Sequence, residues 1–86
     1  MSKHYGIIPQ ITMDALDRYV HQGIPTGGFL YAVLTNDLFE AMGRADQNNR
    51  AVLFEICQYI YNLVPSGAWG TPEKVKAWSD TFKTKT

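Results

Sequence analysis

The sequence predicts an all-α protein, a small bundle of about four helices that forms a single domain over residues 1–86. Glycine and proline divide the chain into four stretches of helical length, with breaks at Pro9, from Gly23 to Gly28, at Gly43 and from Pro65 to Pro72. Within these stretches, apolar residues recur at spacings of three and four, which is typical of helices with one buried face. The length of 86 residues also fits one domain.

The first two predicted helices lie before Gly43. The first runs from about Thr12 to Gln22, with Thr12 as its N-cap and Gly23 as its C-terminal stop. Its apolar residues share one face, namely Met13, Leu16, Tyr19 and Val20. The second runs from about Gly28 to Met42, and Gly43 closes it. Its apolar positions are Leu30, Val33, Leu34, Leu38 and Ala41.

The third predicted helix has Asp46 as its N-cap and is the most apolar segment. From Val52 to Val64, ten of thirteen residues are apolar or aromatic by direct count. Its β-branched residues recur every fourth position, which places them on one helical stripe and not in the alternation of a strand, at Val52, Ile56, Ile60 and Val64. Such a helix needs cover on most sides, so we expect it to be central in the bundle or shared between the core and a subunit interface.

The fourth predicted helix begins with Thr71 as a cap and Pro72 at the first helical position, where proline is favoured. Its apolar stripe consists of Val75, Trp78 and Phe82. Residues 1–10 and 83–86 are expected to be flexible ends.

The composition disfavours several classes of function. Eight basic and eight acidic side chains cancel, so the molecule lacks the positive field of a protein that coats duplex nucleic acid. The sequence shows no secretory signal and no apolar run long enough to span a membrane, so a cytoplasmic location is expected. A domain this small is marginally stable, and the single cysteine, Cys57, allows no internal disulfide. Homo-oligomerisation is therefore the expected source of additional stability.

No group of residues resembles a catalytic or metal centre, so we expect neither enzymatic activity nor a metal or cofactor. Cys57 falls among Phe54, Ile56 and Ile60 and is interpreted as an inert core thiol. The side chains of Asp14, Asp17 and His21 share a helix face, but three such ligands make a weak metal site. A solvated helix face is the favoured interpretation.

Two glycine-rich turns have alternative interpretations. The segment IPTGGFL leads into the second helix, where free backbone N–H groups can accept a phosphate or carboxylate, but it lacks the P-loop lysine and spacing. We favour a tight interhelical turn. The second turn, PSGAWGTP, carries Trp69 on a short loop. Its ring is either exposed for binding or a hydrophobic lid on the end of the bundle.

The strongest candidate binding site is a polar corner at residues 36–50, which lies between the second and third predicted helices. Its candidate ligand-binding residues are Asn36, Asp37, Arg44, Asn48, Asn49 and Arg50. Arginine binds phosphate bidentately, amide side chains read base edges, and the rings of Tyr59 or Trp69 can stack. The alternative is structural: Asp46 caps a helix, Asp37 pairs with Arg44, and the asparagines are turn residues.

Three blocks of the chain resemble a family of small proteins encoded by tailed bacteriophages and prophages. The blocks are GIPTGGFLYAVLTNDLFEA, GRADQNNRAVLFEICQYIYN and PSGAWGTPEKVKAW, which together extend from Gly23 to Trp78. The resemblance indicates a setting in the cytoplasm of a host cell and carries over no activity. By analogy with small phage accessory proteins, it implies a counter-defence role.

Two functions follow as expectations. The first is an oligomeric sponge, assembled through the third predicted helix, that sequesters a phosphate-bearing nucleotide signal at the polar corner. The second is an inhibitor or adaptor that binds a host defence enzyme through an exposed aromatic helix face.

Overall fold

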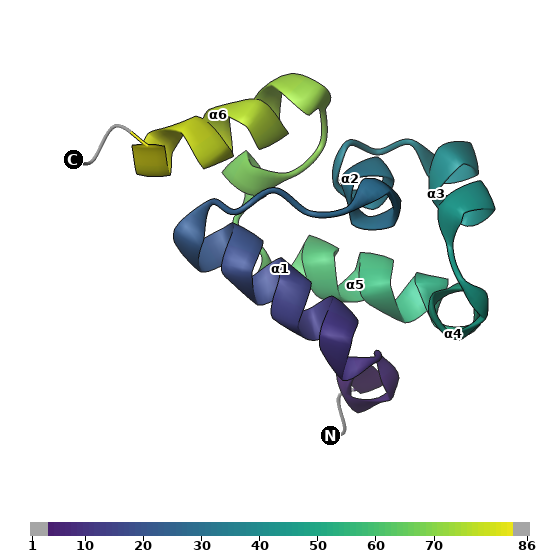
Figure 1. The fold of residues 1–86 in the computed structure, drawn as a ribbon. Coiled ribbons are helices and arrows are strands. Elements are labelled where there is room, and N and C mark those ends of the chain that lie inside the picture. Colours follow the sequence, from purple (N-terminus) through teal and green to yellow (C-terminus); the bar gives the residue numbers. More distant parts are fainter. Residues whose placement is uncertain (1–3, 84–86) are drawn as a thin grey trace.

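Residues 4–83 are described in a computed structural model, and within them the chain forms six α-helices, two short 3-10 helices and no strand (Figure 1). The all-α prediction is therefore confirmed. The elements are η1 (His4–Ile7), α1 (Gln10–Gln22), α2 (Gly28–Leu34), α3 (Leu38–Arg44), α4 (Gln47–Ala51), α5 (Leu53–Leu63), η2 (Ser66–Ala68) and α6 (Pro72–Lys83). Within the described residues, no helix is long and apolar enough to cross a membrane.

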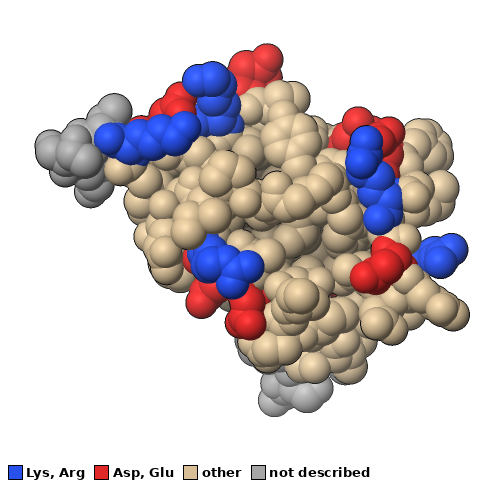
Figure 2. Space-filling model, in the orientation of Figure 1, with Lys and Arg blue, Asp and Glu red and all other residues tan. Residues whose placement is uncertain are grey.

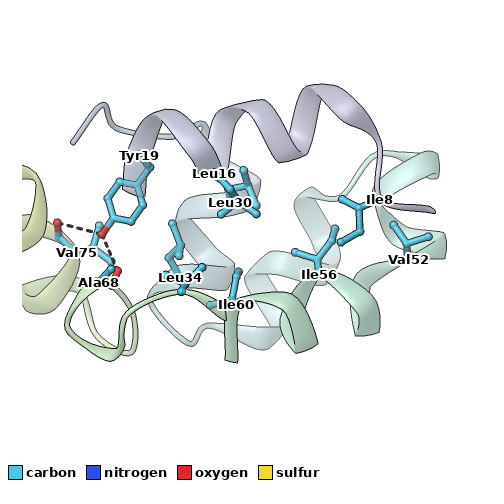
Figure 3. Close-up of a cluster of buried hydrophobic side chains, with 11 residues drawn as sticks. Ile8, Leu16, Tyr19, Leu30, Leu34, Val52, Ile56, Ile60, Ala68 and Val75 are labelled. Carbon is cyan, nitrogen blue, oxygen red and sulfur yellow. Dashed lines mark hydrogen bonds between the residues drawn. The ribbon is translucent and has the colours of Figure 1, made fainter. Parts of the chain in front are cut away.

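The hydrophobic core lies between α1, α2 and α5. Figure 3 shows Leu16 of α1, Leu30 and Leu34 of α2, and Ile56 and Ile60 of α5 pointing toward one another. The predicted stripe of the third helix is confirmed, because all four of its β-branched residues are buried. In Figure 1, α3 and α4 lie at one end of the molecule and α6 at the other.

The second predicted helix is divided into α2 and α3. Asn36 adopts a left-handed backbone conformation, with φ of 66°, which ends the helical path. The side chain of Asp37 then caps α3 by accepting a hydrogen bond from the backbone N–H of Glu40 at 3.3 Å.

The third predicted helix is also divided, at Val52, whose φ of −125° and ψ of 25° leave the helical region between α4 and α5. Asp46 caps α4 as predicted, accepting from the backbone N–H of Asn49 at 2.8 Å. The break turns α4 away from the axis of α5 (Figure 1).

The first helix begins earlier than predicted, at Gln10, directly after Pro9. Thr12 is therefore not the N-cap; it is buried inside α1. Gly23 ends the helix as predicted, with φ of 71°. A Cβ at this glycine would lie 2.6 Å from the ring of Phe82, so α6 packs against the backbone there.

The N-terminal segment from residue 4 to residue 10 belongs to the folded domain, although residues 1–10 were expected to be flexible. Ile8 is part of the buried core, and the ring of Tyr5 packs edge-on against Tyr59 with centroids 5.2 Å apart. The contact places η1 against α5. At the other end, Lys83 is the last residue of α6, and the rest of that expectation concerns residues 1–3 and 84–86, which lie outside the described residues.

Helix α6 is anchored to the bundle by its cap and its apolar stripe. The hydroxyl of Thr71 accepts a hydrogen bond from the backbone N–H of Lys74 at 3.1 Å, as a cap should. Val75 is buried, and Trp78 Nε1 donates to the carbonyl of Val20 at 3.1 Å. The hydroxyl of Tyr19 donates to the carbonyl of Ala68 at 2.6 Å, which ties α1 to the segment before α6 (Figure 3).

Candidate functional site

The polar corner is spread over several surfaces of the folded chain. Arg44 and Asp37 line one cavity of about 290 Å³, together with Gly28, Tyr31 and Thr35. A Cβ at Gly28 would lie 3.0 Å from the guanidinium of Arg44, so this group sits directly over the start of α2. The cavity therefore combines one guanidinium with an aromatic ring and a hydroxyl.

Arg44 already has a carboxylate partner in this cavity. Its Nε donates to Oε2 of Glu40, one helical turn earlier, and both side chains are half exposed. The predicted pairing of Arg44 with Asp37 is wrong, because Asp37 caps α3 and Glu40 lies closer along the helix face. A phosphate at Arg44 would have to displace Glu40 and tolerate Asp37 nearby.

Asn49 links two helices far apart in sequence. It is buried, and its side-chain oxygen accepts a hydrogen bond of 2.7 Å from the hydroxyl of Thr12 in α1. Its backbone N–H is held by Asp46. Asn49 thus fixes α4 to α1, a contact that could not be predicted from the sequence because the two partners are 37 residues apart.

Asn48 and Arg50, in contrast, are exposed on α4. Within residues 4–83, Arg50 takes part in no ion pair. Arg50 lies near the end of α4, three residues before the start of α5, and its guanidinium can bind an anion.

Asn36 and Trp69 meet at another surface, where they line a cavity of about 200 Å³ with Cys57 and Tyr61. Trp69 Nε1 donates to the carbonyl of Val64 at 3.3 Å, and its ring lies 5.9 Å from that of Tyr61. Trp69 therefore packs against the C-terminal end of α5, and its indole N–H already has a hydrogen-bond acceptor. Tyr59 does not join this group, because its ring packs against Tyr5.

Cys57 is exposed, so its prediction as a core thiol is wrong. The stripe of Val52, Ile56 and Ile60 faces the core, and Cys57 lies one position beyond it on α5. Partial desolvation raises the pKa of the Cys57 thiol, which keeps it protonated and weakly nucleophilic at neutral pH.

The charged side chains form small mixed groups. On the face in Figure 2, each cluster of Lys and Arg has Asp or Glu nearby, and uncharged surface separates the clusters. Asp17 and His21 lie 3.5 Å apart on α1, with side chains 69% and 70% exposed, as expected for a solvated face. Among residues 4–83, no group of three or more His, Cys, Asp and Glu residues could hold a metal ion.

Helices α3 and α5 each present more than one large apolar side chain to the outside. On α3 these are Leu38, Phe39 and Met42, and Phe39 is 79% exposed. On α5, Phe54 and Tyr61 are 71% and 74% exposed. Phe54, Cys57, Gln58 and Tyr61 are spaced by three and four residues and are all exposed, so they form one stripe, the α5 outer face.

A further cavity, of about 220 Å³, was not anticipated from the sequence. It lies between α6 and residues 25–31, and its lining includes Tyr31, Lys76 and Ser79. No pattern in the sequence could have indicated it, because its two walls are separated by more than forty residues.

These features define a small all-α domain with several shallow surface cavities and two exposed apolar helix faces. Comparison with protein-family models, with curated proteins and with solved structures gave no significant match.

Proposed function

We propose that this chain is a non-enzymatic binding protein of phage counter-defence, which self-associates through the α5 outer face and sequesters a phosphate-bearing nucleotide signal. The observation that carries the proposal is the exposure of Phe54 and Tyr61 on a helix whose opposite face forms the core. Exposed rings on a small domain mark a surface that another molecule covers.

A second copy of the chain fits this surface. The α5 outer face carries no charged side chain, so two copies of this stripe can approach without like-charge repulsion. A two-fold contact would bring the same stripe of each copy together. The two rings supply on the order of 250 Å² per subunit, about a third of what a stable interface buries per partner. Neighbouring residues would supply the rest.

The phosphate would bind at the polar corner, with Arg50 as its principal contact. Arg50 is exposed and unpaired within the described residues, and Asn48 is exposed on the same short helix, α4, two positions earlier. Arg44 is a second contact, at the cost of its pair with Glu40. The counter-defence role rests on the resemblance to phage proteins.

The test is calorimetric titration with a panel of cyclic di- and trinucleotides. We expect saturable binding of at least one, and we expect Arg50→Ala to weaken it by tenfold or more because a charge-assisted contact is lost. Arg18→Ala is the matched control, since Arg18 is an exposed arginine on α1 far from the corner in sequence. Absence of heat with every nucleotide, or equal loss in both variants, would reject the polar corner as the binding site.

The second candidate is a protein-binding inhibitor that covers a host defence enzyme with an aromatic helix face. The exposure of Phe39 on α3 favours it, because this ring lies on a helix other than α5 and so remains available after self-association.

Affinity capture from host lysate distinguishes the two candidates. An inhibitor should recover one host protein in stoichiometric amount, and Phe39→Ser should abolish the recovery. A nucleotide sponge should recover none, and Phe39→Ser should leave its nucleotide affinity unchanged.

A further inference from the structure

Neither proposed function involves the cavity between α6 and residues 25–31, whose lining combines apolar, aromatic and charged side chains. Its apolar surface comes from Pro25, Pro72 and Val75, which are drawn from two segments far apart in the sequence. The ring of Tyr31 adds an aromatic wall. A volume of about 220 Å³ is below the usual range for drug-sized ligands, so it suits a small molecule with one ring.

Ser79 places an unused hydroxyl in this cavity. The residue is only 8% exposed, yet its side chain has no hydrogen-bond partner within residues 4–83. Every fully enclosed side-chain nitrogen or oxygen of the described residues has a hydrogen-bond partner. Because the Ser79 oxygen has none, it is not fully enclosed, and it reaches solvent through the cavity that it lines. A buried hydroxyl that opens into a cavity is a donor or acceptor for whatever enters.

The rim of the cavity is positively charged. Lys76 and Lys83 both reach toward Asp80, at 2.8 Å and 3.6 Å, so a single carboxylate serves two ammonium groups. The hydrogen bond from Lys76 lowers the pKa of Asp80, which keeps that carboxylate ionised. Two lysines against one aspartate still leave one net positive charge at the mouth.

We infer that this cavity binds a small organic anion, with a ring on Pro25, Pro72 and Val75 and a carboxylate or phosphate group held at the lysine rim. The ammonium groups of Lys76 and Lys83 already lie close to the two oxygens of one carboxylate, that of Asp80. The anionic group of a ligand would bind the same two ammonium groups alongside Asp80. The hydroxyl of Ser79 supplies the hydrogen bond that orients the ligand inside. Binding here does not depend on the polar corner or on self-association.

The test is a nuclear magnetic resonance titration of the ¹⁵N-labelled protein with benzoate and with phenyl phosphate. We expect saturable shifts at the backbone amides of residues 25–31 and 72–83. The two probes show whether the anionic group is a carboxylate or a phosphate. Benzyl alcohol, which has the same ring without charge, should bind at least tenfold more weakly.

Three variants complete the experiment. Ser79→Ala should weaken benzoate or phenyl phosphate binding about tenfold, and Lys83→Gln should weaken it several-fold and reduce its dependence on salt. Lys74→Gln is the matched control, because Lys74 is an exposed lysine of α6 outside the cavity lining. Lys83 is exposed, so its variant tests the inference even if Ser79→Ala perturbs the fold.

Three results would overturn the inference. They are equal affinity for benzyl alcohol and benzoate, equal loss in Lys74→Gln and Lys83→Gln, and no saturable shift at α6 with either anion at millimolar concentration.

Discussion

At the scale of single residues, Tyr19 connects two parts of the fold that are far apart in the sequence. It is fully buried, and its hydroxyl donates to the carbonyl of Ala68, which joins α1 to the segment that leads into α6. Burial raises the pKa of Tyr19 to about 12, from an ordinary value of 10.0. The neutral phenol is thus part of the folded state.

The stability of the protein should therefore fall at alkaline pH. Because the folded-state pKa of Tyr19 is raised, its contribution is fully present below pH 10.0 and is lost as the pH rises through about 12. The loss should be about 1.4 kcal/mol by pH 11 and about 2.7 kcal/mol once the titration is complete. Denaturant unfolding measured between neutral pH and about pH 11 gives the free energy of unfolding at each pH.

Tyr19→Phe is the control for this alkaline loss. It should cost about 1 to 3 kcal/mol at neutral pH, because the carbonyl of Ala68 loses its donor. Its alkaline slope should be shallower than that of the unaltered protein. The same slope in both proteins would assign the titration to another group, such as Cys57 or Tyr59, whose pKa values are also raised by burial.

For some single residues, burial could not be predicted from the sequence. Chemical type alone suggested Asn49 as a ligand contact and Cys57 as core, whereas Asn49 is buried against Thr12 and Cys57 is exposed. Both outcomes depend on packing between distant segments. Capping residues were better predicted, since Asp46 and Thr71 act on a backbone N–H three residues away.

At the scale of elements, periodicity predicted the buried faces but not the helix breaks. The stripe that contains Ile56 and Ile60 was predicted because it depends only on spacing. The break at Asn36 had a local signal, since asparagine tolerates the left-handed conformation and the following Asp37 is a good cap. The break at Val52 had none, because no glycine or proline marks it and the buried position of Val52 is a tertiary effect.

The turn at Asn36 can be tested with two substitutions. Asn36→Gly should leave the free energy of unfolding unchanged or raise it slightly, because glycine adopts a φ of 66° without steric cost. Asn36→Ala should lower it by about 1 kcal/mol. Thermal and urea unfolding of the two variants provide the measurement. If alanine were as stable as glycine, α2 and α3 would be expected to join into the continuous helix that periodicity predicted.

At the scale of the whole molecule, balanced charge and exposed apolar surface act together. The formal net charge is zero, so no long-range repulsion keeps copies of the chain apart. The α5 outer face and the apolar residues of α3 are then free to associate. Stability gained from association would depend on protein concentration.

The double variant Phe54→Ser with Tyr61→Ser should shift the protein toward a monomer. Each ring is more than 70% exposed, so the substitutions should change the fold of one chain little while removing the apolar contact between chains. Sedimentation velocity over a range of concentrations measures the mass. The melting temperature should rise with concentration only in the unaltered protein.

Ile11→Ser is the matched control for the assembly, since Ile11 is 76% exposed but lies on α1. It should leave the sedimentation coefficient unchanged. A monomeric unaltered protein, or equal dissociation by Ile11→Ser, would contradict assembly through the α5 outer face.

The single cysteine offers a direct way to measure the spacing between neighbouring molecules. A nitroxide coupled to the thiol of Cys57 would sit between Phe54 and Tyr61 on the outer stripe, with one label on every chain. Coupling would proceed faster under mildly alkaline conditions, because the raised pKa limits the thiolate. Dipolar electron spin resonance would then report a short distance between labels if the stripes face each other, and no defined distance if the chains stay apart.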